Sequence, residues 1–487
     1  MSTLHESGPL AAARSSRLRV PRPALDTVWA AIVVAVPTAA TWLGRTQAVD
    51  LAYQVRAGTL MLDTHHLLST DPFTFSVAGR GWHNQQWGAE VIFGAVWRLG
   101  GWDGLALLWG LMVGAAAWCV FLACRSSGAN VACAALLTLS GFVVGVPILM
   151  LRPQLIGILL FAIVQWIIAT RHRSPLRLWL VPGLVLVWAN VHGSFILVFA
   201  LLGFAWLEDR ATHEGTLRLI PLVGVVSAAV TLVDPFGYRA WIYVADTVGN
   251  PTVAGRVAEW APPSVRDPVG FLFFGSVLGF FAIVATRRQR VSWRTLLAAS
   301  FFALLGITAI RGVVWWSLAF PPLLAPSLGG VLERPNTRSW VNAALLFGLA
   351  CLLVVALPVR RGNDAGTGGP DVLTFAPQDL VQVVAGAVPP GSHVFASEVY
   401  GSWIEFAAPE LPVFVDPRIE LFPADVWDDY FAVSSGRADW ERILDRLGAR
   451  AVIVNRVWAS GLLDVIDRSP DWRLVASSGD GYAYVRV

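Results

Sequence analysis

Residues 50–90 read DLAYQVRAGTLMLDTHHLLSTDPFTFSVAGRGWHNQQWGAE and lie between a first apolar segment and a long series of further apolar segments. This loop concentrates titratable and amide side chains in a chain that is otherwise poor in charge: Asp50, Tyr53, Gln54, Arg56, Asp63, His65, His66, Asp71, His83, Asn84, Gln86 and Glu90. Ionisable groups beside a bilayer are costly, and proteins keep them there for binding or chemistry. The loop therefore predicts a functional site at a membrane surface.

The composition indicates a membrane protein. Of 487 residues, 55% are hydrophobic and 14% are charged, and the mean hydropathy is +0.59. Soluble domains have about 25% charged residues, so the composition excludes that class. The net charge of +3 is small and scattered, which argues against nucleic acid as a partner. The four cysteines lie within apolar runs, which argues against a disulfide framework or a thiolate metal site.

The apolar segments predict a polytopic α-helical membrane protein of about eleven spans, because a crossing helix needs about 20 apolar residues. The candidates lie near 27–46, 102–124, 129–149, 153–170, 177–191, 194–208, 217–234, 267–286, 295–310, 313–331 and 340–358. The piece 87–99 is short for a span and ends at Gly100-Gly101, so we expect it to be re-entrant or interfacial.

Arginine clusters in the short loops set the expected orientation, since cytoplasmic loops carry an excess of basic residues. The clusters are Arg14, Arg17, Arg19 and Arg22; Arg171, Arg173 and Arg177; and Arg287, Arg288, Arg290 and Arg294. They predict a cytoplasmic N-terminus. The loops 47–88, 190–193 and 235–266, and everything after about residue 359, then lie outside the cell membrane.

The N-terminal residues 1–25 are rich in Ala, Ser, Arg and Pro and predict a disordered cytoplasmic tail. The apolar run that follows lacks a small-residue cleavage site and is followed directly by Arg45-Thr46-Gln47. We therefore expect an uncleaved first helix, with a transmembrane domain spanning 26–358.

The sequence pattern changes after the last apolar segment. Residues 359–375 form a polar, glycine-rich linker that includes RRGNDAGTGGPD at 360–371, and 376–487 predict a small extracytoplasmic α/β domain with a largely parallel sheet. Its expected strands are 393–396, 412–415, 451–455, 472–476 and 482–487, and its helical patterns lie at 377–387, 424–433, 438–448 and 459–467. A glycine-rich phosphate loop is missing from the sequence, so nucleotide binding has no support.

Two carboxylates of the first loop are candidates for catalysis. Asp50 follows the first helix at the outer interface, where a carboxylate can act as a general base on a hydroxyl. Asp50 can equally cap an interfacial helix, and Asp71, which precedes Pro72, can close an Asx turn. Spacing alone leaves both alternatives open.

Further candidates lie on later outer loops. His192 can meet a lipid phosphate or anchor at the interface. Arg152 and Arg311 can bind a phosphate through two hydrogen bonds or extend to the headgroups. The loop 235–266 can close over the site with polar side chains: Asp234, Arg239, Arg256, Glu259 and Trp260.

In the terminal domain, Asp416, Arg418 and Glu420 follow a predicted strand end, where ligands often bind in open α/β sheets. The alternative is an internal salt bridge at a tight turn.

Several short motifs follow one another along the chain in a characteristic order: Asp50-Leu51-Ala52-Tyr53-Gln54, Gly58, Thr70-Asp71-Pro72-Phe73-Thr74-Phe75, Gly81-Trp82-His83-Asn84-Gln85-Gln86-Trp87, Glu90, Arg152-Pro153-Gln154, Trp188-Ala189-Asn190-Val191-His192-Gly193, Glu259-Trp260, Tyr400-Gly401 and Val415-Asp416-Pro417-Arg418. With these motifs the chain resembles a bacterial branch of the GT-C superfamily, the integral-membrane glycosyltransferases that use polyprenyl-phosphate sugars. The resemblance covers nearly the whole chain from residue 27 to 487.

The resemblance implies a GT-C transmembrane fold whose first outer loop holds the catalytic carboxylate. Asp50 would be the general base and Asp71 a second acidic group lining the cleft. Candidate substrate-binding residues are Tyr53, Gln54, Arg56, His83, Gln86, Glu90, Arg152, Asn190, His192, Glu259 and Arg311. The anomeric carbon would be inverted by in-line displacement of the lipid phosphate.

The chain departs from this branch at two places. Relatives tend to have an aromatic-rich stretch where this chain has Ala52, Tyr53 and Gln54, and an acidic residue where it has Gln86. A neutral amide cannot take a proton, so one candidate base or metal ligand is missing. No dense carboxylate cluster that a divalent metal prefers stands in the sequence, so we expect no cofactor or metal.

The resulting hypothesis is a glycosyltransferase of the bacterial inner membrane. It would move a sugar from a polyprenyl-phosphate carrier to a glycan, lipid or protein of the cell envelope, with membrane lipids and no nucleic acid as partners. The alternative is a non-catalytic membrane protein, either a degenerate transferase that serves as a scaffold or a transporter of lipid-linked intermediates.

Overall fold

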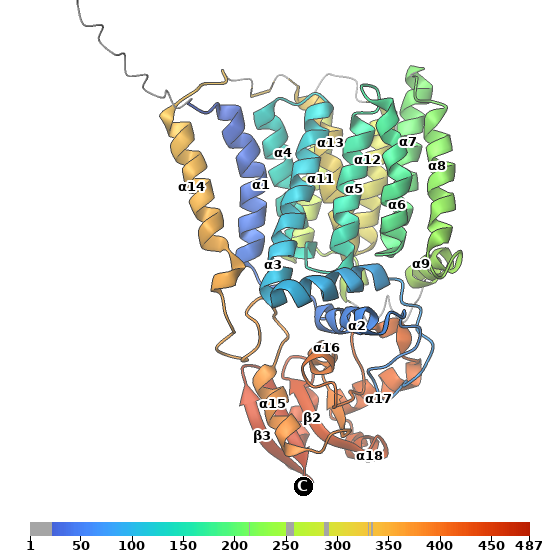
Figure 1. Cartoon of the computed structure of the whole chain (residues 1–487), viewed down its shortest axis with the longest axis vertical. Coiled ribbons are helices and arrows are strands. Elements are labelled where there is room, and N and C mark those ends of the chain that lie inside the picture. Colours follow the sequence, from blue (N-terminus) through green and yellow to red (C-terminus); the bar gives the residue numbers. More distant parts are fainter. Residues whose placement is uncertain (1–21, 214, 250–257, 287–291, 330, 333–334) are drawn as a thin grey trace, which may run out of the picture.

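A computed structural model describes residues 22–213, 215–249, 258–286, 292–329, 331–332 and 335–487. An upright bundle of helices stands on a smaller domain of strands and helices that carries the C-terminus (Figure 1). The following predicted features lie outside the described residues: residues 1–21 of the tail with Arg14, Arg17 and Arg19, and residues Arg256, Arg287, Arg288 and Arg290.

Each of the eleven apolar segments is helical. The bundle consists of α1 (Leu25–Leu43), α3 (Trp87–Ser126), α4 (Val131–Gly145), α5 (Pro153–Ala169), α6 (Leu180–Ala189), α7 (Leu197–Thr212), α8 (Leu219–Val230), α11 (Pro268–Thr286), α12 (Trp293–Thr308), α13 (Val313–Leu324) and α14 (Trp340–Ala356). Short 3₁₀ helices extend or join them: η1 (Val146–Ile148), η2 (Pro175–Trp179), η3 (Gly193–Ile196), η4 (Thr231–Val233), η5 (Ala258–Trp260), η6 (Ile310–Gly312), η7 (Ala325–Leu328) and η8 (Pro358–Arg360).

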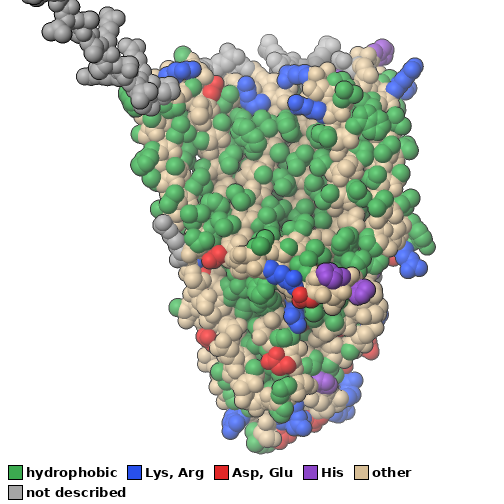
Figure 2. Space-filling model, in the orientation of Figure 1, with side chains coloured by type: hydrophobic (Ala, Val, Ile, Leu, Met, Phe, Trp, Pro, Cys, Tyr) green, Lys and Arg blue, Asp and Glu red, His purple; other side chains and the backbone are tan. Residues whose placement is uncertain are grey.

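By length and composition, four helices in the described part of the chain are sufficient to cross a membrane: Leu25–Leu43, Trp87–Ser126, Val131–Ile148 and Pro268–Thr286. Five more apolar helices are shorter: Pro153–Ala169, Pro175–Ala189, Leu219–Val233, Trp293–Thr308 and Trp340–Ala356. Hydrophobic side chains cover the flank of the bundle, and arginines gather at the end away from the terminal domain (Figure 2). The architecture is that of a multi-pass membrane protein, and the count of about eleven crossings stays a prediction.

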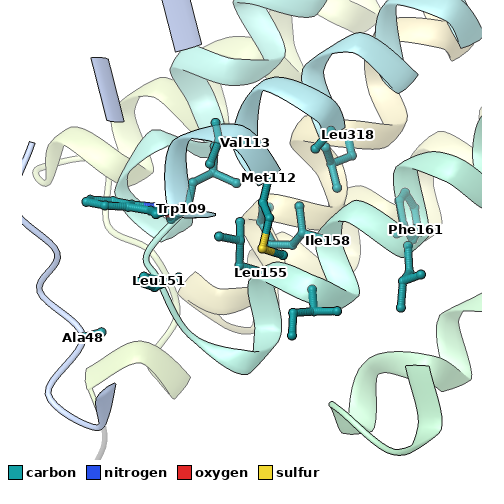
Figure 3. Packing of buried hydrophobic residues seen from close by; sticks show 14 of the residues in the cluster. Ala48, Trp109, Met112, Val113, Leu151, Leu155, Ile158, Phe161 and Leu318 are labelled. Atoms are coloured by element: carbon teal, nitrogen blue, oxygen red, sulfur yellow. The ribbon is translucent and has the colours of Figure 1, made fainter. Parts of the chain in front are cut away.

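The bundle interior is apolar and closely packed (Figure 3). Trp109 and Met112 of α3 lie beside Leu155 and Ile158 of α5, and all four are buried. The Trp109 indole donates a hydrogen bond to the Leu149 carbonyl at 2.6 Å. Lipid tails are as apolar as these side chains, so van der Waals packing and such interhelical hydrogen bonds stabilise the bundle.

Helix α3 changes direction at Gly101. This residue has φ 58° and ψ −151°, a backbone conformation that an L side chain rarely adopts. Residues before the bend lie across the end of the bundle, and residues after it run through the bundle (Figure 1). The piece 87–99 is thus set apart from the rest of α3 by the break that the Gly100-Gly101 pair predicted, and its interfacial placement stays a prediction.

Helix α2 (Leu51–Thr64) lies next to this transverse part of α3 (Figure 1). The two helices cross at two glycines. A Cβ atom on Gly58 would lie 1.8 Å from the Glu90 carbonyl oxygen, and one on Gly94 would lie 2.7 Å from the Gly58 carbonyl carbon. Only glycine permits this approach, which holds the start of α2 and the residue before it, Asp50, beneath the bundle.

The terminal domain has a four-stranded sheet in the order β1-β2-β4-β3. Its strands are β1 (His393–Ala396), β2 (Ala449–Asn455), β3 (Trp472–Ser478) and β4 (Gly481–Arg486), and its helices are α15 (Gln378–Ala387), α16 (Glu398–Ala407), η9 (Ile419–Leu421), α17 (Ala424–Ser434), α18 (Trp440–Arg446) and α19 (Ser460–Ile466). Helix α9 (Arg239–Gly249) belongs to the lower end of the bundle.

Two sequence predictions for this domain are wrong. The sheet is not largely parallel, because only β1 and β2 are parallel, while β3 and β4 form a tight hairpin and β4 returns antiparallel to β2. The segment 412–415 is not a strand. Its Val413 makes isolated bridges to Thr74 of the first loop and to Val394, so its backbone joins two parts of the molecule.

The linker 359–375 is tied to the end of α1. Arg361 donates hydrogen bonds to the carbonyls of Trp42 and Gly44, and its guanidinium binds Asp371. The Thr46 amide donates to the Val372 carbonyl at 2.8 Å. These contacts fix the terminal domain close to the residues that lead into Asp50.

Replacing Gly58 with Ala tests the crossing of α2 and α3. The added methyl group has no space against the Glu90 carbonyl, so we expect the melting temperature in detergent to fall by several degrees, in keeping with an overpacking cost of about 1–3 kcal/mol. The matched control is Gly275→Ala in α11, where a Cβ atom meets nothing within 4 Å. Equal melting temperatures for Gly58→Ala and the wild type would contradict the close approach.

Candidate active site

Asp50 directs its carboxylate toward an arginine. It occupies the N-cap position of α2, yet its side chain makes no capping hydrogen bond. Instead, Oδ2 accepts a hydrogen bond from the Gln54 amide at 3.1 Å, and Oδ1 lies 3.1 Å from Nε of Arg152. The alternative of a purely structural helix cap is therefore not realised in this structure.

Arg152 belongs to a chain of alternating charges. Its Nη1 donates to both carboxylate oxygens of Glu259, at 2.5 and 2.7 Å, and Nη2 of Arg311 donates to Glu259 at 2.9 Å. The Arg311 guanidinium also lies over the ring of Trp260 at 4.5 Å. Two carboxylates and two guanidinium groups thus alternate from Asp50 to Arg311, and their formal charges sum to zero.

The pKa values of this network follow from burial and mutual attraction. Burial alone raises the pKa of Glu259, but the charges of Arg152 and Arg311 outweigh it and hold that pKa below its usual value. Burial opposes the charge of Arg152, but Asp50 and Glu259 overcome it and raise the pKa of the guanidinium. Glu259 and Arg152 are therefore both charged at neutral pH.

A hollow of about 260 Å³ lies beside this network. Polar residues on its wall are Gln85, Gln86, Gln154, His192, Ser194, Thr308 and Arg311, and larger apolar or aromatic ones are Ile196, Leu197, Tyr243, Val244, Trp260, Leu305 and Trp315. Asp50 and Arg152 do not line it. Gln86 connects Asp50 to the hollow, because the Gln54 amide that binds Asp50 lies 3.1 Å from the Gln86 oxygen.

His192 presents a neutral imidazole to the hollow. Its Nδ1 accepts a hydrogen bond from the Ser194 amide at 3.1 Å, which assigns the ring proton to Nε2. Burial, followed by the charges of Arg311 and Arg152, lowers the pKa of His192 to about 3. His192 is thus a hydrogen-bond donor without charge, and Arg311 is the cation on the wall of the hollow.

The remaining candidate residues from the sequence surround the site without lining this hollow. Asn190 accepts a hydrogen bond from the Gly88 amide through its backbone carbonyl at 3.0 Å. Glu90 is fully buried and accepts from the Asn84 amide at 2.6 Å. Arg56 is half-buried on α2. These residues shape the loop and the α2–α3 crossing.

His83 lies in a stack of rings, with its centroid 4.1 Å from that of Phe236 and 5.0 Å from that of Tyr243. Burial lowers its pKa. The stack joins the first loop to α9 beside the hollow. Tyr243, Ser194, Gln85 and Gln154 were not among the site residues predicted from the sequence. Gln85 and Gln154 stand within quoted motifs, Gly81–Trp87 and Arg152-Pro153-Gln154, and Tyr243 and Ser194 gave no such signal.

In the described part of the chain, no three His, Cys, Asp or Glu residues group together in a way that could hold a metal ion. The positive charges of the site are those of Arg152 and Arg311. The expectation of metal independence stays a prediction.

Comparison with known proteins addresses the fold. Neither a protein-family model nor a curated protein sequence matches the chain. Several solved structures are similar over nearly all of it, and three represent them. They are the archaeal oligosaccharyltransferase AglB from Archaeoglobus fulgidus in complex with an inhibitory peptide and a dolichol-phosphate, the arabinofuranosyltransferase AftD from Mycobacteria, and ArnT from Cupriavidus metallidurans in the apo state.

The similarity to AglB has a TM-score of 0.58 at 12% identity and covers 94% of this chain and 74% of AglB. For AftD the TM-score is 0.55 at 15% identity over 96% of this chain, which spans 40% of AftD. For ArnT it is 0.51 at 14% identity over 95% and 98% of the two chains. These neighbours are GT-C glycosyltransferases. The chain has the GT-C fold.

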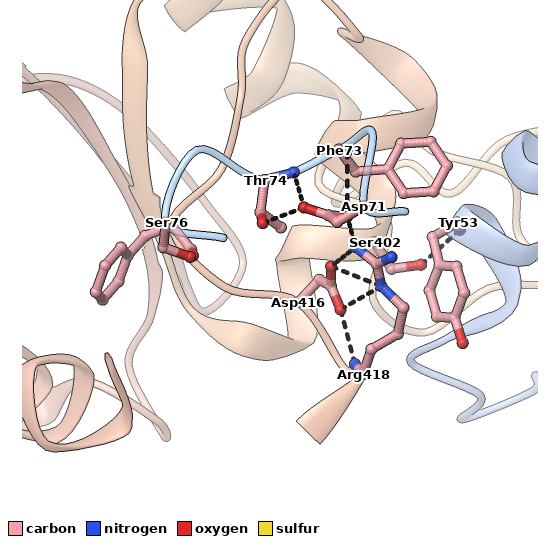
Figure 4. A network of polar contacts seen from close by, with 9 residues as sticks. Tyr53, Asp71, Phe73, Thr74, Ser76, Ser402, Asp416 and Arg418 are labelled. Atoms are coloured by element: carbon pink, nitrogen blue, oxygen red, sulfur yellow. Dashed lines mark hydrogen bonds and ion pairs between the residues drawn. The ribbon is translucent and has the colours of Figure 1, made fainter. Parts of the chain in front are cut away.

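On this GT-C fold, a buried ion cluster holds the first loop to the terminal domain (Figure 4). The Arg418 guanidinium binds Asp71 at 2.6 Å and also binds Asp416, and all three side chains are at most 1% exposed. Asp71 accepts further hydrogen bonds from the Phe73 amide at 3.3 Å and from the Thr74 amide at 3.0 Å. The Asx turn and the internal ion pair that the sequence left open as alternatives are both present.

Asp71 therefore does not line the cleft, contrary to the expectation from the family resemblance. Its two oxygens are used by Arg418, Phe73 and Thr74, and the side chain is buried away from the hollow. Glu405 is the next carboxylate of the cluster. Burial, then the charge of Asp416, raises the pKa of Glu405 well above its usual value.

Aromatic rings of the first loop and α2 surround the same guanidinium. The ring of Tyr53 lies 5.4 Å from Arg418, that of Phe73 5.1 Å and that of Trp82 4.5 Å. The Tyr53 amide donates to Ser402 Oγ at 2.8 Å. The predicted substrate residue Tyr53 thus fixes the first turn of α2, and with it Asp50, to the terminal domain.

Replacing Arg418 with Gln tests this anchor. The variant leaves Asp71 and Asp416 buried without their cation, which lowers the free energy of unfolding by about 3–5 kcal/mol. We expect a lower melting temperature and faster proteolysis within 65–82 of the folded protein. The control Arg437→Gln removes an exposed guanidinium from the same domain. An Arg418→Gln protein with wild-type stability and protease resistance would show that the cluster does not hold the loop.

Proposed function

We propose that this protein is a membrane glycosyltransferase that transfers a sugar from a polyprenyl-phosphate carrier to an acceptor of the cell envelope. The observation that carries the proposal is the charge chain Asp50-Arg152-Glu259-Arg311 beside a hollow with polar and apolar walls. The GT-C fold supports it, because the neighbouring structures include an oligosaccharyltransferase in complex with a dolichol-phosphate and an arabinofuranosyltransferase.

The hollow suits the phosphate end of a lipid. Arg311 and the Nε2–H of His192 provide one charged and one neutral donor for phosphate oxygens. Leu197 and Leu305 on the same wall provide an apolar surface for the first carbons of a polyprenyl chain. A lipid phosphate needs this combination, whereas a soluble sugar nucleotide does not.

Asp50 serves as the general base. As the acceptor hydroxyl attacks the anomeric carbon, its oxygen forms the new glycosidic bond and its proton moves to Asp50. The bond between the anomeric carbon and the phosphate oxygen breaks, and polyprenyl phosphate leaves with the electron pair. A single displacement of this kind inverts the anomeric centre.

The ion network can stabilise the charge that moves from Asp50 to the phosphate in this step. Proton transfer neutralises Asp50 while one negative charge appears on the departing phosphate, so the total charge of the site is unchanged. Arg152, which binds Asp50 and Glu259 before the reaction, loses its partner Asp50 at the moment when the phosphate gains charge. Electrostatic stabilisation by such a preorganised cation is a large contribution in enzyme catalysis.

The proposed location is a bacterial inner membrane with the N-terminus cytoplasmic and the terminal domain extracytoplasmic. The arginines at the end of the bundle away from the terminal domain support this orientation by the positive-inside rule (Figure 2). Asp71 is assigned to the anchor of the loop and takes no part in the proposed chemistry.

Replacing Asp50 with Asn tests the base. With purified protein in lipid nanodiscs, a panel of polyprenyl-phosphate sugars and an envelope extract as acceptor, we expect turnover to fall at least about 100-fold. The control Asp63→Asn alters an exposed carboxylate on the same helix. Turnover of Asp50→Asn at the level of Asp63→Asn would exclude Asp50 as the base. A cellular role that survives Asp50→Asn would favour the non-catalytic scaffold.

Replacing Arg311 with Gln tests the phosphate site. Loss of one charged donor weakens binding of undecaprenyl phosphate by about ten-fold, as measured by titration into nanodisc-embedded protein. Arg98→Gln, which removes a guanidinium bound to Asp63 outside the hollow, leaves the affinity unchanged. Equal affinities for Arg311→Gln and the wild type would place the lipid phosphate elsewhere.

A further inference from the structure

A second hollow of about 270 Å³ adjoins the first. Residues of three parts of the chain line it: Arg80, Gly81, Trp82 and His83 of the first loop, Tyr243 and Asp246 of α9, and Glu420 and Leu421 of η9 in the terminal domain. Tyr243 lines both hollows, and its stack with His83 forms part of the wall between them. The second hollow is therefore next to the proposed donor site and on the side of the terminal domain.

The chemistry of the second hollow differs from that of the first. Asp246 and Glu420 are exposed, and neither forms a salt bridge within the described residues. Carboxylate oxygens accept hydrogen bonds from hydroxyl and ammonium groups. The half-buried ring of Tyr243 adds an apolar face on which the C–H groups of a sugar can pack. Hydrogen-bond acceptors beside an aromatic ring are suited to binding a saccharide.

The net charge of the side chains that line the second hollow affects which saccharides can bind there. Asp246 and Glu420 contribute two carboxylates, with the pKa of Glu420 raised by desolvation, Arg80 contributes one positive charge, and burial lowers the pKa of His83 and so favours its neutral form. The net charge of the lining is thus negative. Uronic acids and phosphorylated sugars are repelled, whereas neutral and amino sugars are not.

We infer that the second hollow binds the acceptor, and that the acceptor is a neutral or amine-bearing saccharide. This inference rests on the proposed function, because it needs a donor in the first hollow. Glu420 is the contribution of the terminal domain, and Arg418 two residues earlier fixes its position through Asp71. The segment 416–420 therefore has one part that anchors the domain and one part that contacts the substrate.

The test measures binding of three disaccharide probes and of undecaprenyl phosphate to the full chain in nanodiscs, by saturation-transfer NMR and titration. We expect methyl mannobioside and the glucosamine disaccharide to bind and digalacturonate not to bind. Glu420→Gln and Asp246→Asn each lower the affinity for the glucosamine disaccharide about ten-fold and leave the affinity for undecaprenyl phosphate unchanged. The matched control Glu410→Gln changes an exposed glutamate of the terminal domain outside the hollow and has no effect.

The outcomes separate the inference from the proposed function. If undecaprenyl phosphate binds but no disaccharide does, or if Glu420→Gln and Asp246→Asn leave disaccharide binding unchanged, the acceptor site is wrong and the function stands. Digalacturonate bound as tightly as the neutral probe overturns the charge argument. A neutral pentapeptide that binds in place of the sugars, with the same sensitivity to Glu420→Gln, also overturns the inference. A wild-type protein that fails to bind undecaprenyl phosphate contradicts the proposed function itself.

Discussion

The buried contact of Arg418 with Asp71 and Asp416 is the constraint on which the arrangement of the site depends. A guanidinium taken out of water is costly unless its charge and its N–H groups are paired, and here two carboxylates and three aromatic rings surround it. Because Asp71 and Arg418 are far apart in the sequence, the ion pair is satisfied only when the first loop docks on the terminal domain. Folding of the two parts is thereby coupled.

This coupling also fixes the position of Asp50, the candidate base, because residues close to it in the sequence contact the later part of the chain. Asp50 lies between Thr46, whose backbone is bonded to the linker at Val372, and Tyr53, whose backbone is bonded to Ser402. Both contacts come from the part of the chain after the bundle. The close approach of Gly58 to Glu90 fixes the same helix to the transverse part of α3. Asp50 is thus held from three sides by rigid elements, as the proposed role of a general base that meets a hydroxyl in one geometry requires.

The site itself contains equal numbers of positive and negative side chains, and all of them are half-buried. Asp50, Arg152, Glu259 and Arg311 alternate, so each cation contacts an anion and the network carries no net charge before a substrate enters. A balanced network tolerates the boundary between the apolar bundle and the terminal domain, where isolated charges would be costly. It can also respond when charge moves from one carboxylate to a phosphate.

The amino-acid sequence alone was enough to predict the class, the apolar helices and which charged residues are candidates for the site. Long apolar segments have no alternative to helices in a bilayer, and the Gly100-Gly101 pair predicted the break in α3. Asp50, Arg152, Glu259 and Arg311 were all candidates, because ionisable side chains stand out against so apolar a chain.

How these residues are paired depends on the fold as a whole. Arg152 and Glu259 are separated by more than a hundred positions, and local sequence carries no information on which arginine meets which carboxylate. The same holds for Asp71, where the turn was visible in the sequence but the partner Arg418 was not. The antiparallel return of β4 and the bridging role of Val413 were missed because strand order depends on long-range packing. Pairing across the chain is set by the packing of whole elements, so the components of the site can be found in the sequence, whereas their contacts depend on the fold.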